Sequence, residues 1–228
     1  IAGSFSRTLL GHRDRANGSM PSPAIYTSSW TIRSSVSTLI GSTRSRSASA
    51  QQTVSSQTGT LTVDLHVHSR FSMATSPSLD IPTLTEAARL KGIDVLATGD
   101  FTHPAWLSEL RDQLSECSDG VFSSSSGGRF ILGTEISCVW KQDGRGRRVH
   151  LLLLAPDFAA VDGIVAQLAK IARLASDGRP ILKLSASEAA RIAWDADERC
   201  VVIPAHVWTP WYGLLGSKSG FDSIEECF

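Results

Sequence analysis

The sequence predicts an α/β domain with much parallel sheet, arranged as a sandwich or a barrel, behind a disordered N-terminal tail. Two observations lead to this fold class. After residue 60, short apolar segments typical of buried strands alternate with segments whose apolar residues recur at helical steps. Before residue 60, the sequence is too polar to form a core. We therefore expect a disordered extension at residues 1–59 and a folded domain at residues 60–228.

The extension is rich in Ser, Thr, Arg, Gly and Gln, with six arginines and a single acidic residue, Asp14. This composition also fits an organelle transit peptide. We favour a flexible extension or upstream sequence, since the composition is ambiguous and the chain begins with Ile1. The whole chain has 22 basic and 22 acidic residues, so 16 and 21 of them remain in the domain. A net-negative domain argues against a broad nucleic-acid groove.

Apolar residues make up 42% of the chain and charged residues 19%, which suits a soluble globular protein. No apolar run approaches the roughly 20 residues of a membrane span, so no membrane partner is expected. The cysteines are widely spaced and form no C-x-x-C pair; they are Cys117, Cys138, Cys200 and Cys227. This spacing indicates neither a disulfide framework nor a zinc ribbon, and it favours a reducing, cytoplasmic location.

The predicted strands lie at residues 61–66, 93–98, 130–138, 149–155 and 200–205, and the predicted helices at 82–91, 104–114, 157–174 and 185–195. Gly92 is suited to end the first helix, and Ser185 with Glu188 has the spacing of a capping box before the last. Residues 117–128 are rich in Ser and Gly and read as a loop. Strands 130–138 and 149–155 are candidates for a hairpin across 143–146.

Histidine and carboxylate side chains lie just past four of the predicted strands. In chain order they are His66 and His68, Asp100 and His103, Glu135, and His206. In a parallel α/β sheet, the loops beyond the carboxyl ends of the strands converge on one face. Imidazole and carboxylate are ligands that zinc, manganese and iron accept. The pattern predicts a metal site, in which we assign catalysis to Asp100 and His103.

Each of these residues has a simpler explanation when taken alone. An H-x-H pair is a common chance motif, and Asp100 could cap the following helix. Glu135 could be a solvated strand end, and His206 a hydrogen-bonded loop histidine. Random placement would not tend to put all of them after buried strands, which favours metal binding. His150 is a weaker candidate ligand, because it lies at the start of its strand, which is the wrong end if that strand is parallel. If strands 130–138 and 149–155 are antiparallel, His150 would face Glu135 still less directly.

Aromatic side chains and a cation follow His206 in a glycine-rich segment; they are Trp208, Trp211, Tyr212 and Lys218. Aromatic rings interleaved with a basic residue could stack a base and hold a phosphate. Packing against the core is the alternative for the rings. We predict that these residues bind the substrate.

The motifs resemble those of the PHP (polymerase and histidinol phosphatase) superfamily at residues 64–69 (DLHVHS), 98–103 (TGDFTH), 133–135 (GTE) and 204–206 (PAH). Longer blocks resemble the endonuclease Q family at residues 99–104 (GDFTHP), 205–211 (AHVWTPW) and 216–223 (GSKSGFDS). The resemblance covers residues 60–228, and the last two blocks are long enough to be specific.

The resemblance implies a distorted β/α, TIM-like PHP barrel that holds two or three divalent ions, either zinc or manganese, with magnesium a further candidate. The superfamily completes its ligand set with an Asp-x-His motif after a later strand. Because this chain stops before that motif, we expect a barrel that is incomplete at its C-terminus, and we question its activity in this form.

The implied function is metal-dependent hydrolysis of phosphodiesters. Endonuclease Q cuts DNA on the 5′ side of deaminated bases such as uracil and hypoxanthine, so DNA with deaminated bases is the expected partner. One alternative is a PHP phosphatase acting on a small phosphomonoester. Another is a non-catalytic PHP module within a larger DNA-processing protein. The residues that follow Phe228 would separate these functions.

Overall fold

The computed structural model describes residues 30–32 and 60–228. Its strands are β1 (Trp30–Ile32), β2 (Leu61–Asp64), β3 (Val95–Ala97), β4 (Leu114–Ser118), β5 (Val121–Ser124), β6 (Arg129–Gln142), β7 (Arg145–Ala155), β8 (Ile181–Leu182) and β9 (Val201–Pro204). Its helices are α1 (Ile81–Lys91), α2 (Pro104–Gln113), α3 (Phe158–Leu168), the 3-10 helix η1 (Leu174–Ser176), α4 (Ala186–Ala196) and α5 (Ile224–Cys227).

These strands form one nine-stranded mixed sheet. β2, β3 and β6 pair in parallel, and β8 joins β6 in parallel. The β4–β5 and β6–β7 hairpins and the β7–β9 pair are antiparallel. The predicted α/β class is confirmed. The sheet is open, because β1, β4 and β9 each pair with a single strand, so a closed barrel is not formed by the described residues.

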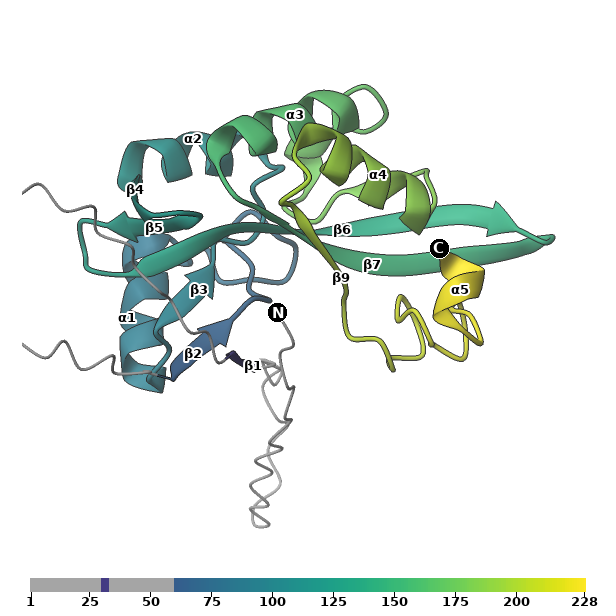
Figure 1. Cartoon of the computed structure of the whole chain (residues 1–228), viewed down its shortest axis with the longest axis horizontal. Helices are drawn as coiled ribbons and strands as arrows, with labels where there is room; N and C mark the ends of the chain where they lie inside the picture. The colour runs from purple at the N-terminus through teal and green to yellow at the C-terminus, as the bar shows by residue number, and fades with distance from the viewer. Residues whose placement is uncertain (1–29, 33–59) are drawn as a thin grey trace, which may run out of the picture.

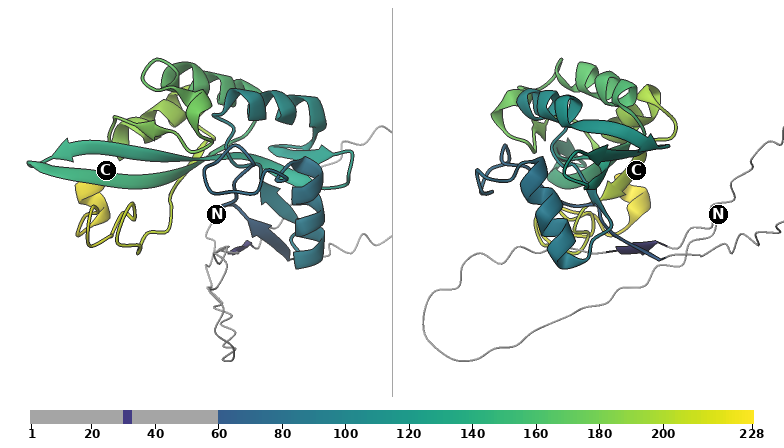
Figure 2. Two further views of the ribbon diagram at one scale, coloured as in Figure 1. Left: turned by 180° about the vertical axis from the view of Figure 1, so that it is seen from behind. Right: turned by 90° about the vertical axis from the view of Figure 1, so that its left-hand side faces the viewer.

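The helices cover the sheet unequally (Figures 1 and 2). α2, α3 and α4 lie along one side of the long β6–β7 hairpin, and α1 lies beside β2 and β3. The segment after β9 and the short α5 lie on the other side of the hairpin. Buried side chains from α2, α3 and α4 belong to one main core together with buried side chains of both hairpin strands, among them Trp106, Leu110, Ile164 and Ala189.

The helix ends follow the capping signals of the sequence. The Asp80 carboxylate accepts a hydrogen bond from the Thr83 amide at the start of α1, and Gly92 ends the helix with φ +67°. Ser185 and Glu188 form the predicted capping box of α4. The predicted helices are confirmed, except that α3 ends at Leu168, six residues before the predicted end at residue 174.

The predicted loop at 117–128 is wrong in part, because β4 and β5 form a hairpin there. The side chains of β5 alternate between half-buried and buried, with Phe122 and Ser124 facing inward. Serine at a buried strand position removes the apolar alternation by which a strand is recognised. The serine at this buried position explains why composition alone suggested a loop.

The hairpin between β6 and β7 is confirmed and is longer than predicted. Its two-residue turn is Asp143 and Gly144, with φ +51° and +74°, the left-handed pair that tight hairpin turns need. β6 runs on to Gln142, so Glu135 lies within the strand and not at its end. The prediction for Glu135 was wrong because the strand continues past the part that pairs with β3.

Most of the predicted disordered extension lies outside the described residues. Within it, Trp30–Ile32 departs from the prediction, since this segment pairs antiparallel with Leu61–Val63. The pairing gives partners to backbone groups that would otherwise be open on the outer edge of β2. Among the residues that are described, no helix has the length and apolar character needed to cross a bilayer.

Candidate metal centre

Four histidines converge on one buried carboxylate, Glu135, which is 1% exposed. Its Oε1 lies 3.3 Å from His66 Nε2, 3.0 Å from His150 Nδ1 and 3.2 Å from His206 Nε2. Its Oε2 lies 3.2 Å from His68 Nε2. Both oxygens of a single side chain are therefore shared between imidazoles from three separate parts of the chain.

The ends of two strands and the middle of β7 bring the rings together. His66 and His68 follow β2, and their ring centroids are 5.5 Å apart. His206 follows β9 with φ +31°, a conformation that costs energy for a non-glycine residue, and it stacks 5.9 Å from His66. The side chains beyond the carboxyl ends of β2 and β9 therefore converge, as predicted.

His150 lies much closer to Glu135 than the sequence suggested. In the β6–β7 hairpin, Ser137 pairs with His150 and Glu135 with Leu152. Residues two apart on a strand share a face, so Glu135 and His150 are diagonal neighbours on the same side of the sheet. The Ser137 hydroxyl lies 2.6 Å from His150 Nε2 and leaves Nδ1 facing the carboxylate. The expectation that an antiparallel pairing would separate them was wrong.

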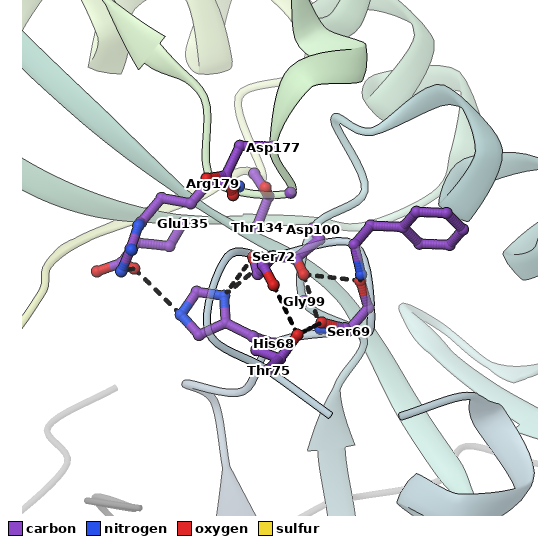
Figure 3. A network of polar contacts seen from close by, with 12 residues as sticks. His68, Ser69, Ser72, Thr75, Gly99, Asp100, Thr134, Glu135, Asp177 and Arg179 are labelled. Carbon is purple, nitrogen blue, oxygen red and sulfur yellow. Dashed lines mark hydrogen bonds and ion pairs between the residues drawn. The ribbon is translucent and has the colours of Figure 1, made fainter. Parts of the chain in front are cut away.

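Asp100 contacts the centre through His68 (Figure 3). Its Oδ1 lies 2.9 Å from His68 Nδ1, and its Oδ2 accepts hydrogen bonds from the amide and hydroxyl of Ser69, both at 2.7 Å. A carboxylate on the far nitrogen of an imidazole fixes the orientation of the ring and raises its basicity as a ligand. Asp100 has φ +52°, which is again a strained position.

His103 lies apart from the four converging histidines. It occupies the N-cap position of α2 without a side-chain capping hydrogen bond, and its ring stacks on Phe71 with centroids 4.4 Å apart. Its Nδ1 is buried and has no hydrogen-bond partner among the described residues. Direct metal ligation or catalysis by Asp100 and His103 therefore stays a prediction.

Arg179 also reaches the centre, and sequence reasoning missed it. Its Nη1 lies 3.3 Å from Glu135 Oε2. The loop before it is pinned: the Gly178 amide donates to Phe71 O, and the Arg179 amide donates to the Asp177 carboxylate. Because 44 residues separate Arg179 from Glu135 and it lies in a loop, no periodic pattern indicates this contact.

The electrostatics of the cluster favour a negatively charged Glu135. Burial alone would raise its pKa, but hydrogen bonds from His150, His206, His66 and His68 outweigh burial and hold the pKa well below its usual value. Burial has the opposite effect on a histidine, whose charged form is the protonated one, and it lowers the pKa of His150. For His68 the effect of burial is outweighed by Asp100 and Glu135, which raise its pKa to about 9.

The donor set fits divalent metal ions. Two groups of ligand atoms lie close enough to share an ion each: His66, His68 and Glu135, and Glu135, His150 and His206. In the second group, His150 Nδ1 lies 3.0 Å from His206 Nε2 while both face the same carboxylate oxygen. Imidazole nitrogen and carboxylate oxygen are the ligand atoms that zinc accepts, so a cation fits between them.

Metal binding is expected to release a proton from His68. A ligand imidazole must be neutral, and with a pKa of about 9 this ring is mostly protonated at pH 7. The affinity for Mn²⁺ should therefore rise about tenfold per pH unit between pH 7 and 9. Calorimetric titrations in two buffers with different ionisation enthalpies count the released protons. An affinity that does not change across this window would contradict the assignment of His68.

The predicted substrate-binding residues follow His206. Trp208 and Trp211 are 73% and 53% exposed, and Lys218 is also exposed. Tyr212 is half-buried and packs against His150, with ring centroids 4.2 Å apart. The two tryptophans are thus not packed in the core. Tyr212 instead packs against His150 of the centre.

Two solved structures are similar to this chain in both fold and sequence. The chain matches the lesion-specific endonuclease Q of Pyrococcus furiosus with 33% identity and a TM-score of 0.62, over 72% of this chain and 38% of that one. It matches endonuclease Q bound to a 27-mer duplex substrate with an abasic lesion at the active site with 34% identity and a TM-score of 0.63, over 73% and 39% of the two chains. This chain resembles endonuclease Q. The resemblance to the PHP superfamily that the motifs indicate is confirmed.

A relative of unknown function in Methanocaldococcus jannaschii is 31% identical to the chain over 163 residues. The match covers 71% of this chain and 18% of the relative. No family model matches the chain. The chain thus spans less than two-fifths of the endonuclease Q chains that it resembles.

Proposed function

We propose that this chain is the metal-binding part of a nuclease that hydrolyses DNA phosphodiesters beside deaminated bases. The convergence of four histidines on the shared Glu135 carries the proposal, and the likeness to endonuclease Q supports DNA as the partner. The same proposal places the open sheet in the distorted β/α barrel of the PHP superfamily, with zinc or manganese as the metals.

The histidines and Glu135 would hold two divalent ions, which supply activation of water and neutralisation of charge on a phosphate. Glu135 keeps its negative charge because four imidazoles face it. Asp100 fixes the ring of His68 through Nδ1 and leaves Nε2 free to bind. The hydroxyls of Ser137 and Thr209 do the same for His150 and His206.

Arg179 would hold the substrate phosphate. Its guanidinium contacts the Glu135 carboxylate, and its side chain is 33% exposed. Ions bound to Glu135 compete for that carboxylate, and the guanidinium is then available to a phosphate oxygen. Guanidinium groups suit this role because they bind phosphate through two parallel hydrogen bonds.

The test is an incision assay on the complete gene product. With Mn²⁺ we expect cutting 5′ of a single deoxyuridine or deoxyinosine in a duplex, and no cutting of the undamaged duplex or after chelation. A deaminated base pairs poorly, so extruding it from the duplex costs less than extruding a normal base. Rapid hydrolysis of small phosphomonoesters, without cutting of the lesion duplex, would show that the protein is a phosphatase and not a nuclease.

A matched pair of tryptophans tests the recognition of the lesion. Trp211 and Trp194 are 53% and 51% exposed, but Trp211 follows the metal centre and Trp194 lies on α4. Base stacking on an aromatic ring contributes about 1–3 kcal/mol, so Trp211→Ala should lower the preference for the lesion about tenfold. Trp194→Ala should preserve it. If both variants behave alike, Trp211 does not stack the base.

A further inference from the structure

A polar cleft opens between the outer part of the β6–β7 hairpin and the segment after β9. Its volume is about 460 Å³, and residues 145–147 and 215–222 line it. The segment after β9 runs beside β7: the His150 amide donates to Tyr212 O, and the Arg148 amide donates to Ser219 O. Figure 1 shows this segment beneath the hairpin. The same segment carries His206 directly after β9.

The segment is folded so closely that several positions accept only glycine. A Cβ at Gly216 would lie 2.3 Å from Thr209 O, and one at Gly220 would lie 2.4 Å from the Gly216 amide nitrogen. Arg147 ties the segment to the hairpin by a hydrogen bond to Gly220 O, and its guanidinium lies 4.1 Å from the centroid of Phe221. One wall of the cleft is therefore preorganised.

We name two exposed cations at this cleft the basic rim: Lys218 lines the cleft, and Arg148 directly follows its lining residue Arg147 on β7. Neither forms an ion pair among the residues that the structure describes. One carboxylate, Asp222, also lines the cleft. The rim is thus a local basic surface on a domain that holds more acidic than basic residues.

Arg148 connects the rim to the metal centre. It lies two residues before His150 on β7, and so on the same face of the strand, roughly 7 Å away along it. Its guanidinium lies 5.5 Å from the Trp211 ring and 5.9 Å from the Tyr212 ring, and Tyr212 in turn packs against His150. Stacking on two rings orients a guanidinium without neutralising it.

We propose that the basic rim binds the phosphodiester backbone of DNA next to the bond placed at the metal centre, an inference that rests on the proposed function. A strand of duplex DNA carries a phosphate about every 3.4 Å along the helix axis. Arg148 is therefore positioned for a phosphate about two nucleotides from the centre, and Lys218 for a neighbouring phosphate. Trp211 is 53% exposed beside Arg148, where an extruded base would stack.

The experiment compares the double variant Arg148→Gln, Lys218→Gln with the wild type. Fluorescence anisotropy of an undamaged labelled duplex is measured in EDTA over a range of salt concentrations. Each lost phosphate contact lowers the slope of log K against log salt by about 0.9, so the slope should fall by roughly 1 to 2. The Kd should rise at least tenfold at low salt. Arg89→Gln, which removes an exposed charge on α1, should bind like the wild type.

Equal Kd and salt slope in the double variant and the wild type would overturn the inference, as would the absence of binding by the wild type. Competition by polyaspartate as effective as that by DNA would overturn it too, by showing a general anion surface. The variant should keep its melting temperature and metal content, because the two side chains are exposed. Binding in EDTA needs no catalysis. Failure of the wild type to cut lesion DNA with Mn²⁺ would therefore count against the proposed function separately.

Discussion

Replacing Glu135 with glutamine is expected to remove metal from both halves of the centre at once. This carboxylate belongs to both groups of potential ligands, and each of its oxygens faces imidazole nitrogens. An amide has no negative charge and presents a donor where an acceptor is needed. Changes next to metal ligands already cost 10–100-fold in affinity, so loss of the shared ligand should cost more than about 100-fold. Elemental analysis after dialysis measures the effect.

Glu109→Gln is the matched control, because Glu109 is also partly buried but pairs with Arg70 outside the centre. It should retain the metal content of the wild type. Double replacements divide the two groups: His66→Ala with His68→Ala, or His150→Ala with His206→Ala, should each remove about one ion of two. Full metal content in the Glu135 variant would show that this carboxylate is no ligand.

Gly178→Ala is expected to damage the centre without touching any of its ligands. A Cβ at Gly178 would lie 2.5 Å from Asp100 Cγ and 2.6 Å from Ser72 Oγ. Asp100 is fully buried and holds the ring of His68, so it cannot move without releasing that ring. Overpacking of this kind costs about 1–3 kcal/mol of stability, and a misplaced His68 should weaken metal affinity by about 10–100-fold.

Gly146→Ala provides the control, because a Cβ there meets no atom within 4 Å. Chemical denaturation and metal titration of both variants measure stability and affinity in parallel. If Gly178→Ala binds metal like Gly146→Ala, the link between Asp100 and His68 does not matter for metal binding. The comparison also separates an orienting role of Asp100 from mere packing, since its charge is retained in both variants.

Most of the centre could be predicted because it follows from the direction of strands. His66, His68 and His206 follow β2 and β9, whose apolar residues are visible in the sequence. Glu135 was found by its place in an apolar segment. His150 was underrated, since the register of an antiparallel hairpin decides which residues face each other, and the register follows from the Asp143–Gly144 turn.

Other features carried no local signal. Arg179 reaches Glu135 from a loop, and the orientation of Asp100 towards His68 depends on the packing of Gly178 and Ser69 around it. The open sheet could not be predicted, because composition does not distinguish a barrel from a mixed sheet interrupted by a long hairpin. The basic rim was hidden by the net negative charge of the domain, which averages over all its faces.

Electron paramagnetic resonance of the chain loaded with two equivalents of Mn²⁺ tests the central claim most directly. Two ions that share the Glu135 carboxylate should be magnetically coupled, and their spectrum should differ from that of isolated Mn²⁺. The coupling should disappear in Glu135→Gln and in the variant that lacks His150 and His206. Two independent, uncoupled Mn²⁺ signals in the wild type, or a coupled signal that survives in Glu135→Gln, would contradict a centre built on this residue.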